Sequence, residues 1–472
     1  MKFPDLLCTK LGKEVPMKTS TACLSHSVKL VAFSILLVTS GWIQASQAIQ
    51  EVSRSEVGEW LEATKGLEPR FKPGDVLTAD DLDKIKPFLP PGPIGEMAFP
   101  EFSMEISETG NYAPHPAYQQ ATLQFQGQAS LGPDGALTNY IAGQPFSNPS
   151  IDNASAEQAG LMAAWNNAFR WQHYGQKVIF AHNLFLEERD NASSDFSIFP
   201  PEMISGGGHI ERSVDLGWRR VYMSRLAQLA NNNYRFDFRG AESSIYKELT
   251  EYFAPFEFRD QKLLAERWAD PHENDTLNAY LPGERKVRRL SAKEKSDTWL
   301  GGEITYDDFY GFDGNVLSNT WTYLGRHRVL AVMNTKHQYI RHYGPHSRVL
   351  NDRWELRNAL VVEGVPTLEG HPYGSRMMFF DSENYNFIIG LYFDPQGRLM
   401  RGSTPAYSWS EDTLDNPEEN HGAHVSMYKG YAFMNFQTGR TSLTNVIQTS
   451  YPKAEAKEVR RLYRVDTLNQ GR

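Results

Sequence analysis

The feature that most constrains the fold is a series of short strand-like runs, some of which alternate apolar and polar residues, separated by residues that favour tight turns. Leu277 to Leu281 and Lys286 to Leu290 flank the turn residues 282–285, and Phe387 to Phe393 is followed by the turn 394–397. Further runs of this kind include Tyr234 to Phe238, Trp321 to Tyr323, Trp354 to Val362, Met377 to Phe379 and Arg398 to Gly402. A period of two is typical of strands, and no regular alternation with helices follows. The sequence therefore predicts an antiparallel meander that curls into a barrel, half-barrel or sandwich.

The pattern also predicts a hairpin and two helices. From Thr122 to Leu131 the odd positions are mostly apolar and the even ones polar, which favours a strand, and the turn 132–135 leads into a second strand over 136–142. Ser155, three residues before Gln158, is typical of a helix start, so we expect a helix over 155–171 that covers or fills the sheet. A closing helix is predicted within 453–468. No internal repeat is evident.

The first 48 residues have the features of a secretory signal peptide. Five lysines precede the apolar run Leu30 to Val38, and Ser46-Gln47-Ala48 offers small residues at the positions before a cleavage site. A nine-residue run is too short to span a bilayer, and no later segment reaches the ~20 apolar residues that a transmembrane helix needs. We expect an exported, soluble chain that begins near Ile49. Met17 is an alternative start.

Composition narrows the possible functions. The chain has 48 Lys and Arg against 57 Asp and Glu, and without residues 1–48, which contain five lysines and two acids, the net charge falls from −9 to −12. This acidity argues against a nucleic-acid binder. Both cysteines, Cys8 and Cys23, precede the cleavage site, and neither directly follows it, so the mature chain is expected to lack disulfides and a lipid anchor.

Residues 49–118 are interpreted as an N-terminal arm, helical and then proline-rich, and residues 119–472 as the β-rich domain. Ser53 and Glu56 have the spacing of a capping box, as do Thr78 and Asp81, so each pair predicts a short helix. Seven prolines between 87 and 116 exclude a regular helix and indicate an extended segment that lies on the surface of the rest.

Several residues could form a metal site or a phosphate loop. His421 and His424 follow Glu418 and Glu419, and His342 precedes His346, but glycine or proline between the histidines denies them a shared helix face. A polar loop is the preferred interpretation, and no metal or cofactor is predicted. The glycines 206–208 before His209 lack the Lys-Ser/Thr of a phosphate-binding loop, so a flexible loop is expected.

Acidic and basic residues give two further candidates. Asp307 and Asp308 could act in acid/base chemistry, but adjacent residues of a strand point to opposite faces, so we prefer a role in capping the turn that follows. A short basic hairpin is formed by Arg285, Lys286, Arg288 and Arg289. It is interpreted either as a charged edge strand that resists pairing or as a docking patch for an acidic partner or lipid headgroups.

Aromatic residues are abundant, with 22 Tyr, 26 Phe and 10 Trp, and many fall at alternating strand positions. A curved sheet with one aromatic face either packs as ordinary core or encloses an apolar cavity, and both alternatives remain open here. The candidate lining residues are Trp299, Tyr306, Phe309, Trp321, Tyr323, Phe379, Phe387 and Ile389.

Motifs in a fixed order between about residues 67 and 402 resemble the bacterial family called domain of unknown function 1329 (DUF1329). The first group comprises Gly127-Gln-x-x-Leu131, Tyr140-Ile-Ala-Gly-Gln-Pro-Phe146, Trp165-Asn166 and Arg285-Lys-Val-Arg-Arg-Leu-Ser291. The second comprises Asp307-Asp-Phe-Tyr-Gly-Phe312, Trp321-x-Tyr-Leu-Gly325, Arg376-Met-Met-Phe-Phe-Asp381 and Tyr392-Phe-Asp394. Several ordered motifs are more specific than any single one.

The resemblance implies a periplasmic protein of mainly β (α+β) class, with a strongly curved antiparallel sheet or half-barrel wrapped over helices, LolA/LolB-like. It also implies an apolar interior for acyl chains, and as partners an exporter of the resistance-nodulation-division type and an outer-membrane protein. It transfers no catalytic residue. Together with the apolar strand faces, it favours carriage of a lipid-like hydrophobic ligand between the membranes. The alternative is a periplasmic hydrolase of a polysaccharide or ester that uses Asp307, Asp308, Glu303 or His209.

Overall fold

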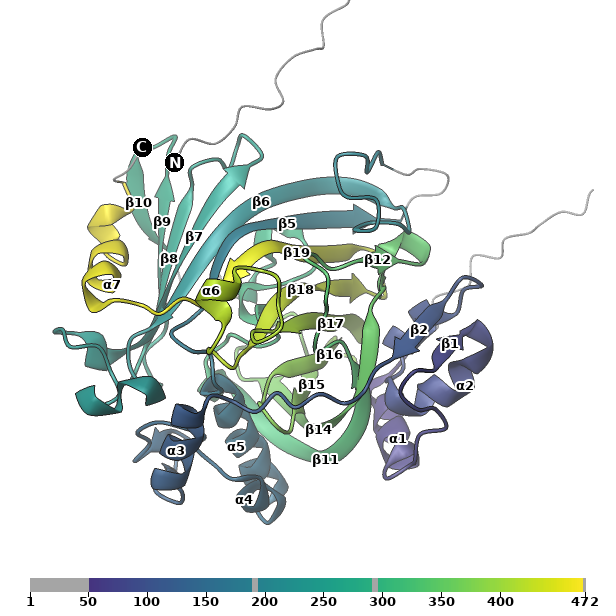
Figure 1. Cartoon of the computed structure of the whole chain (residues 1–472), viewed down its shortest axis with the longest axis horizontal. Helices are drawn as coiled ribbons and strands as arrows, with labels where there is room; N and C mark the ends of the chain where they lie inside the picture. Colours follow the sequence, from purple (N-terminus) through teal and green to yellow (C-terminus); the bar gives the residue numbers. More distant parts are fainter. Residues whose placement is uncertain (1–50, 189–193, 291–295, 470–472) are drawn as a thin grey trace, which may run out of the picture. The chain divides into compact units, whose positions relative to one another are not determined.

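A computed structural model describes residues 51–188, 194–290 and 296–469. The predicted signal peptide lies outside these ranges. The chain forms a mixed α+β structure around one 15-stranded sheet, in the order β1-β2-β14-β15-β16-β17-β18-β19-β5-β6-β7-β8-β9-β10, with β11 paired to β14 (Figure 1). All neighbours are antiparallel except β2 and β14. The predicted antiparallel sheet of an α+β protein is confirmed.

The strands of this sheet are β1 (Val76–Thr78), β2 (Ser103–Ile106), β5 (Lys177–Glu187), β6 (His209–Tyr222), β7 (Ser244–Ala254), β8 (Lys262–Trp268), β9 (Thr276–Leu281), β10 (Lys286–Leu290), β11 (Asn319–Ala331), β14 (Arg353–Pro366), β15 (Ser375–Asp381), β16 (Phe387–Phe393), β17 (Leu399–Trp409), β18 (Ser426–Asn435) and β19 (Thr441–Ser450). Two separate pairs are β3 (Ser130–Leu131) with β4 (Leu137–Thr138), and β12 (His342–Tyr343) with β13 (Val349–Leu350).

The α-helices are α1 (Arg54–Thr64), α2 (Leu82–Ile85), α3 (Pro116–Gln124), α4 (Asn148–Asp152), α5 (Ala156–Ala168), α6 (Pro417–Asn420) and α7 (Ala456–Leu462). Single 3-10 turns include η1 (Ala79–Asp81), η2 (Lys86–Phe88), η3 (Pro93–Met97), η4 (Ala227–Asn232), η5 (Ala241–Ser243), η7 (Trp299–Gly301), η8 (Tyr306–Asp308), η9 (Val316–Ser318), η10 (Pro345–Ser347) and η11 (Val465–Thr467). No helix in the described residues is long and apolar enough to cross a membrane.

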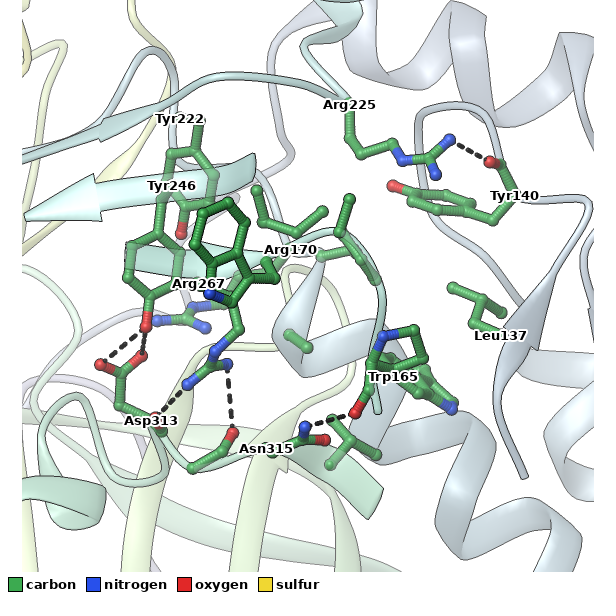
Figure 2. A pocket seen from close by; sticks show the side chains of 18 of the residues that line it. Leu137, Tyr140, Trp165, Arg170, Tyr222, Arg225, Tyr246, Arg267, Asp313 and Asn315 are labelled. Carbon is green, nitrogen blue, oxygen red and sulfur yellow. Dashed lines mark hydrogen bonds between the residues drawn. The ribbon is translucent and has the colours of Figure 1, made fainter. Parts of the chain in front are cut away.

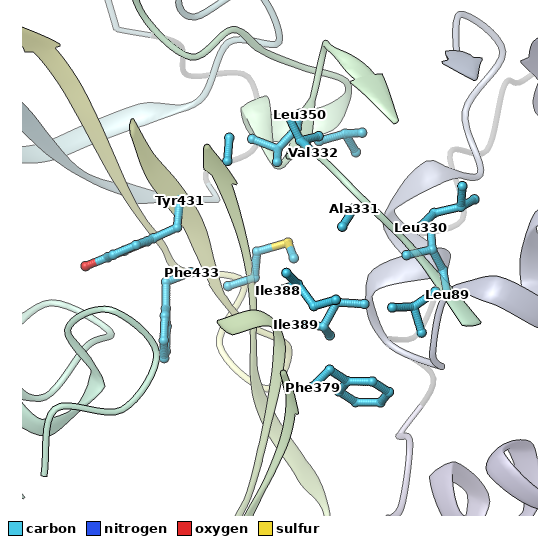
Figure 3. Packing of buried hydrophobic residues seen from close by; sticks show 14 of the residues in the cluster. Leu89, Leu330, Ala331, Val332, Leu350, Phe379, Ile388, Ile389, Tyr431 and Phe433 are labelled. Carbon is cyan, nitrogen blue, oxygen red and sulfur yellow. The ribbon is translucent and has the colours of Figure 1, made fainter. Parts of the chain in front are cut away.

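The middle of the sheet is buried on both faces. Along β15, Phe379 packs in the cluster that contains α1 and the residues after it, whereas Met378 and Phe380 pack against α5. Every residue of β15 and β16 is buried. Figure 3 shows Leu89, from the N-terminal segment, beside Leu330, Ile389 and Phe379. Alternate residues of β15 therefore serve two separate hydrophobic clusters.

Bulges bend the long strands β5 and β6, which arch beside β19 in Figure 1. Their register shifts between Val178 and Ala181 and again between Phe185 and Leu186. An extra residue on one strand strengthens the local twist and bends the strand.

The N-terminal helices start where their capping residues predict. Ser53 accepts a hydrogen bond from the Glu56 amide, and Glu56 bonds back to the Ser53 amide. The proline-rich segment contains no α-helix before α3, but it holds η3 and β2, and its Phe102 is nearly fully buried in the largest cluster. The segment is thus an integral part of the core as well as a covering layer. The boundary at residues 118/119 stays a prediction.

The strand predicted over 122–131 is wrong for most of its length. Pro116 starts α3, with the His115 imidazole accepting from the Ala117 amide, and the helix runs to Gln124. Leu123, expected to be buried, is 73% exposed, because the helix instead buries Tyr118 and Ala121 against the cluster of Trp171 and its neighbours. The hairpin survives only as β3 and β4, two residues each. Helical packing of Tyr118 and Ala121 outweighed a period-two pattern whose polar half was one threonine, three glutamines and one serine.

The strand predicted at 234–238 does not form either. Asn233 and Tyr234 both have positive φ, at 53° and 58°, which turns the chain out of an extended conformation. Phe236 and Phe238 stack on each other and join a cluster with Tyr174 and Val459. In contrast, α5 begins at the predicted Ser155 cap, and α7 occupies the middle of the predicted closing helix.

Candidate ligand-binding site

One face of β6 to β9 forms the floor of two neighbouring cavities. The side chains on this face follow the period of two, so they come from alternate residues of each strand. They are Leu216, Trp218, Tyr246, Glu248, Thr250, Tyr252, Leu263, Ala265 and Leu277. The roof is residues 299–316, which include η7 and η8 and which we call the cover segment. Two hollows remain between the floor and the cover segment.

The first hollow, which we call the aromatic cavity, has a volume of about 70 Å³. The cover segment contributes Trp299, Tyr306, Phe309 and Tyr310 to its lining. The indole Nε1 of Trp299 donates to the Tyr252 hydroxyl at 3.1 Å, and that of Trp218 donates to the Tyr310 hydroxyl at 2.6 Å. Because these polar atoms are paired with one another, the rings present mainly apolar surface to the cavity.

The second hollow, which we call the arginine cavity, also has a volume of about 70 Å³ (Figure 2). It lies further along β6 and β7, between the end of α5, the residues after β4 and the cover segment. Its lining includes the rings of Tyr140, Trp165, Phe169, Tyr222 and Trp268. Four arginines line it as well: Arg170, Arg220, Arg225 and Arg267.

A polar partition separates the two cavities, and both Tyr246 and Asp313 line each of them. Asp313 accepts from Arg220 at 2.9 and 2.6 Å and from the Tyr246 hydroxyl at 3.1 Å. Arg267 donates to the Asp313 carbonyl at 2.6 Å and pairs with Asp275. The partition therefore holds the cover segment to the floor through a network of charge-assisted hydrogen bonds.

Burial and ion pairing together set the protonation states of the side chains in this partition. Burial disfavours the charged form of Arg220, but Asp313 and Glu248 outweigh it and raise its pKa well above the usual value. Arg267 behaves in the same way, with Asp275 as its main partner, and its pKa is also raised. Burial raises the pKa of Tyr246, which keeps its hydroxyl protonated as a donor to Asp313. The partition is therefore fully paired at neutral pH.

The eight predicted lining residues fall into two groups. Trp299, Tyr306 and Phe309 line the aromatic cavity. The others pack in hydrophobic clusters: Trp321, Tyr323 and Phe387 near α5, and Phe379 and Ile389 in the largest cluster. Sequence reasoning missed Trp218, Tyr252 and Tyr310. The run 218–222 (Trp-Arg-Arg-Val-Tyr) does not alternate apolar and polar residues, so it carries no period-two signal for Trp218. No sequence signal singles out Arg170 or Arg225.

The carboxylates considered for catalysis hold the fold together. Asp308 is buried, caps the turn by accepting from the Thr305 amide and hydroxyl, and accepts from the Tyr373 hydroxyl at 2.7 Å. Burial raises its pKa, an effect that Arg376 opposes. Asp308 thus caps a turn, but this turn is η8, which Asp308 ends, and not the turn that follows as predicted. Glu303 pairs with Arg401, and His209, the first residue of β6, lies 3.7 Å from Glu187.

The histidine motifs occupy different settings. His421 and His424 both approach Glu411, at 3.3 and 3.7 Å. His342 is fully buried, and burial lowers its pKa to about 3, whereas His346 pairs with Glu188. Within the described ranges no group of three or more His, Cys, Asp or Glu residues is placed to hold a metal ion.

The basic hairpin formed by β9 and β10 lies at the end of the sheet order. Arg285, Lys286, Arg288 and Arg289 are all exposed. Arg288 pairs with Glu284 at 2.5 Å, and Arg289 donates to the Thr276 hydroxyl. An exposed, charged last strand agrees with both interpretations of the hairpin, edge protection and docking.

Comparison with known proteins adds the following. No curated protein matches the chain. A crystal structure of an outer membrane lipoprotein-sorting protein domain from Vibrio parahaemolyticus is similar at 15% identity and a TM-score of 0.43, over 66% of this chain and 100% of that one. The crystal structure of a DUF1329 family protein from Desulfovibrio piger is similar at 10% identity and a TM-score of 0.40, over 63% of this chain and 94% of that one. The crystal structure of a LolA superfamily protein from Nitrosomonas europaea is similar at 12% identity and a TM-score of 0.35, over 64% of this chain and 97% of that one.

The sequence model of one protein family matches residues 76–469, which is most of the chain. This match includes the floor strands, the cover segment and both cavities. The chain therefore belongs to the family described as "Protein of unknown function (DUF1329)".

Proposed function

We propose that this protein is a periplasmic carrier or accessory protein that binds a lipid-like hydrophobic ligand and serves transport between the inner and outer membranes. The observation that carries the proposal is the aromatic cavity, in which aromatic rings of the cover segment face one side of β6 to β9. Ligand pockets are concave, mostly apolar and equipped with a few placed polar groups, and the adjoining partition supplies such groups.

The aromatic cavity is too small to hold a long acyl chain unless the protein opens. A volume of about 70 Å³ is well below the several hundred Å³ of a typical ligand pocket. A long acyl chain therefore requires the cover segment to shift away from the floor strands. In this proposal the bent strands act as a half-barrel whose roof is the cover segment, and the bonds at Asp313 tether that roof.

Two partners complete the proposal. A carrier without a nucleotide-binding motif must receive its cargo from, or pass it to, a membrane machine. An exporter of the resistance-nodulation-division type and an outer-membrane protein fit this role, with the basic hairpin as the docking surface. The charges of Arg285, Lys286, Arg288 and Arg289 suit an acidic surface on either partner.

Identification of the bound molecule tests the proposal directly. Protein purified from a periplasmic extract is extracted with organic solvent, and the extract is analysed by mass spectrometry. We expect a stoichiometric lipid or lipid-like molecule, and we expect added fatty acid or phospholipid to raise the melting temperature of stripped protein. Absence of bound lipid together with unchanged melting would contradict carriage.

The same preparation tests the location. N-terminal sequencing should give Ile49 as the first residue if cleavage follows Ala48. Recovery of a chain that retains Leu30 to Val38 in the inner-membrane fraction would contradict the proposed export.

A further inference from the structure

Arg170 and Arg225 lie where two hollows meet. Both line the arginine cavity, and both also line a smaller neighbouring cavity of about 30 Å³ together with Tyr118, Trp171 and His173. Arg170 follows α5, and Arg225 follows β6, so residues 55 positions apart in sequence present their side chains to one region. A group bound there is within reach of both guanidinium groups.

Neither arginine has a charged partner. Arg170 donates from Nε to the Asn386 side-chain oxygen at 3.1 Å and from Nη1 to the Asn167 carbonyl at 2.7 Å. Arg225 donates from Nη1 to the Tyr140 carbonyl, and its guanidinium lies 5.5 Å from the centre of the Tyr140 ring (Figure 2). In the described parts of the chain, no carboxylate lies within ion-pair distance of either residue, and neither Nη2 donates to a protein atom.

The other two arginines of the cavity have the carboxylate partners that Arg170 and Arg225 lack. Arg220 pairs with two carboxylates and Arg267 pairs with one. These pairs raise the pKa values of both arginines. Burial instead lowers the pKa of Arg225, since only Tyr140 opposes the effect. Four arginines against the three carboxylates Glu248, Asp275 and Asp313 leave the surroundings of the cavity with a net charge of +1. An anion placed there would restore the balance.

The backbone at Arg225 is also held in an unusual conformation. Its φ is 63°, in the left-handed region that residues other than glycine rarely adopt. Such conformations persist only where the surrounding structure enforces them, and they cluster at binding sites. Here the residue in this conformation lines the cavity, with its guanidinium over the Tyr140 ring.

We propose that Arg170 and Arg225 bind the anionic headgroup, a carboxylate or a phosphate, of the amphiphile that this protein carries. The inference rests on the proposed function and adds the class and the orientation of the ligand. A planar guanidinium can donate two parallel hydrogen bonds to either anion. The hydrocarbon part then lies along Trp165, Phe169 and Phe312 and, once the partition opens, extends past Tyr246 into the aromatic cavity.

Three probes with the same twelve-carbon chain test this inference on the delipidated mature protein. They are dodecanoate, dodecyl phosphate and dodecanol, titrated by calorimetry at a pH at which dodecanoate is ionised. We expect at least one of the two anions to bind roughly tenfold or more tightly than the alcohol, because charge-assisted hydrogen bonds are stronger than neutral ones. The preferred anion separates a fatty acid from a phosphate-bearing lipid.

Variants then assign the preference to the two side chains. Arg170→Gln combined with Arg225→Gln should bring the affinities for anion and alcohol close together and leave the alcohol affinity unchanged. Arg170→Lys combined with Arg225→Lys should retain part of the preference, because the charge remains. The matched control is Arg464→Gln, which removes an exposed arginine paired with Asp466 and should change nothing.

The outcomes separate the two proposals. Equal binding of anions and alcohol by the wild-type protein would overturn the headgroup site and leave carriage intact, and this comparison does not depend on whether a variant folds. A preference that persists in the folded double glutamine variant would likewise overturn the role of these arginines. Failure of all three probes to bind would contradict carriage itself.

Discussion

Asp313 accepts hydrogen bonds from Arg220 through both of its carboxylate oxygens, and this ion pair joins the cover segment to the floor strand β6 between the two cavities. Arg220 also pairs with Glu248 on β7 at 2.8 Å. The pair is largely shielded from water, with 6% and 16% of the two side chains exposed. The pair is therefore one of the contacts that hold the cover segment to the floor, and it lies between the two cavities.

Replacement of Asp313 should weaken the fold and loosen the cover segment. Asp313→Asn leaves the buried Arg220 with one carboxylate fewer, and removal of one member of a buried pair costs about 3 kcal/mol. We expect the free energy of unfolding in urea to fall by about this amount and hydrogen exchange to rise in residues 299–316. Asp466→Asn, in an exposed pair, is the control and should leave the urea midpoint unchanged. An unchanged midpoint for Asp313→Asn would show that the partition does not hold the cover segment.

Filling the aromatic cavity should block the ligand without unfolding the protein. Ala265 on β8 lines this cavity, and Ala265→Leu adds bulk to a space that is otherwise empty. We expect dodecanol affinity to fall about tenfold or more, while the melting temperature stays the same or rises, since cavity filling commonly stabilises a fold by roughly 0.5–2 kcal/mol. Ala230→Leu, at an exposed position of η4, is the control. Unaltered binding in the folded Ala265 variant would place the ligand elsewhere.

His342 should make the protein sensitive to acid. It is fully buried, neither ring nitrogen has a hydrogen-bond partner in the described residues, and its pKa is lowered to about 3. The unfolded chain takes up a proton near pH 6.5, whereas the folded protein does not until about pH 3. Stability is therefore fully present above pH 6.5 and declines as the pH falls toward 3, by up to about 1.4 kcal/mol per pH unit.

The test compares His342→Gln with the wild-type protein by urea unfolding between pH 7 and pH 4. The variant should lose stability less steeply, because it no longer contributes this proton. His173 and His371, whose pKa values are lowered to about 4, remain in both proteins and cancel in the comparison. Parallel slopes for the wild-type protein and His342→Gln would contradict the prediction.

Charge reversal in the basic hairpin tests docking. Arg288→Glu combined with Arg289→Glu should weaken crosslinking to the exporter or the outer-membrane partner, more strongly at low salt, because exposed charges are then less screened. The melting temperature should hardly change, since both side chains are exposed. Arg460→Glu with Arg461→Glu on α7 is the matched control. Full crosslinking by a folded hairpin variant would remove this surface from the proposal.

The sequence alone determined the features that depend on neighbours a few residues away. The capping residues Ser53 and Ser155 start α1 and α5, and the turn at 282–285 joins β9 to β10, as predicted. Short apolar runs bounded by turn residues identified β14 to β16, because such runs are typical of buried strands. Residue order within a motif was likewise sufficient to indicate the family.

Only the tertiary structure decided which aromatic side chains face a cavity and which arginines lack a partner. Trp299 and Trp321 are both buried tryptophans, yet the first lines the aromatic cavity and the second packs against α5. Arg170 and Arg225 line the same cavities although 55 positions separate them, which no local pattern encodes. Thr122 to Gln124 became helical because Tyr118 and Ala121 found distant partners. In each case the deciding free energy comes from contacts between residues far apart in sequence, and such contacts exist only once the chain has folded.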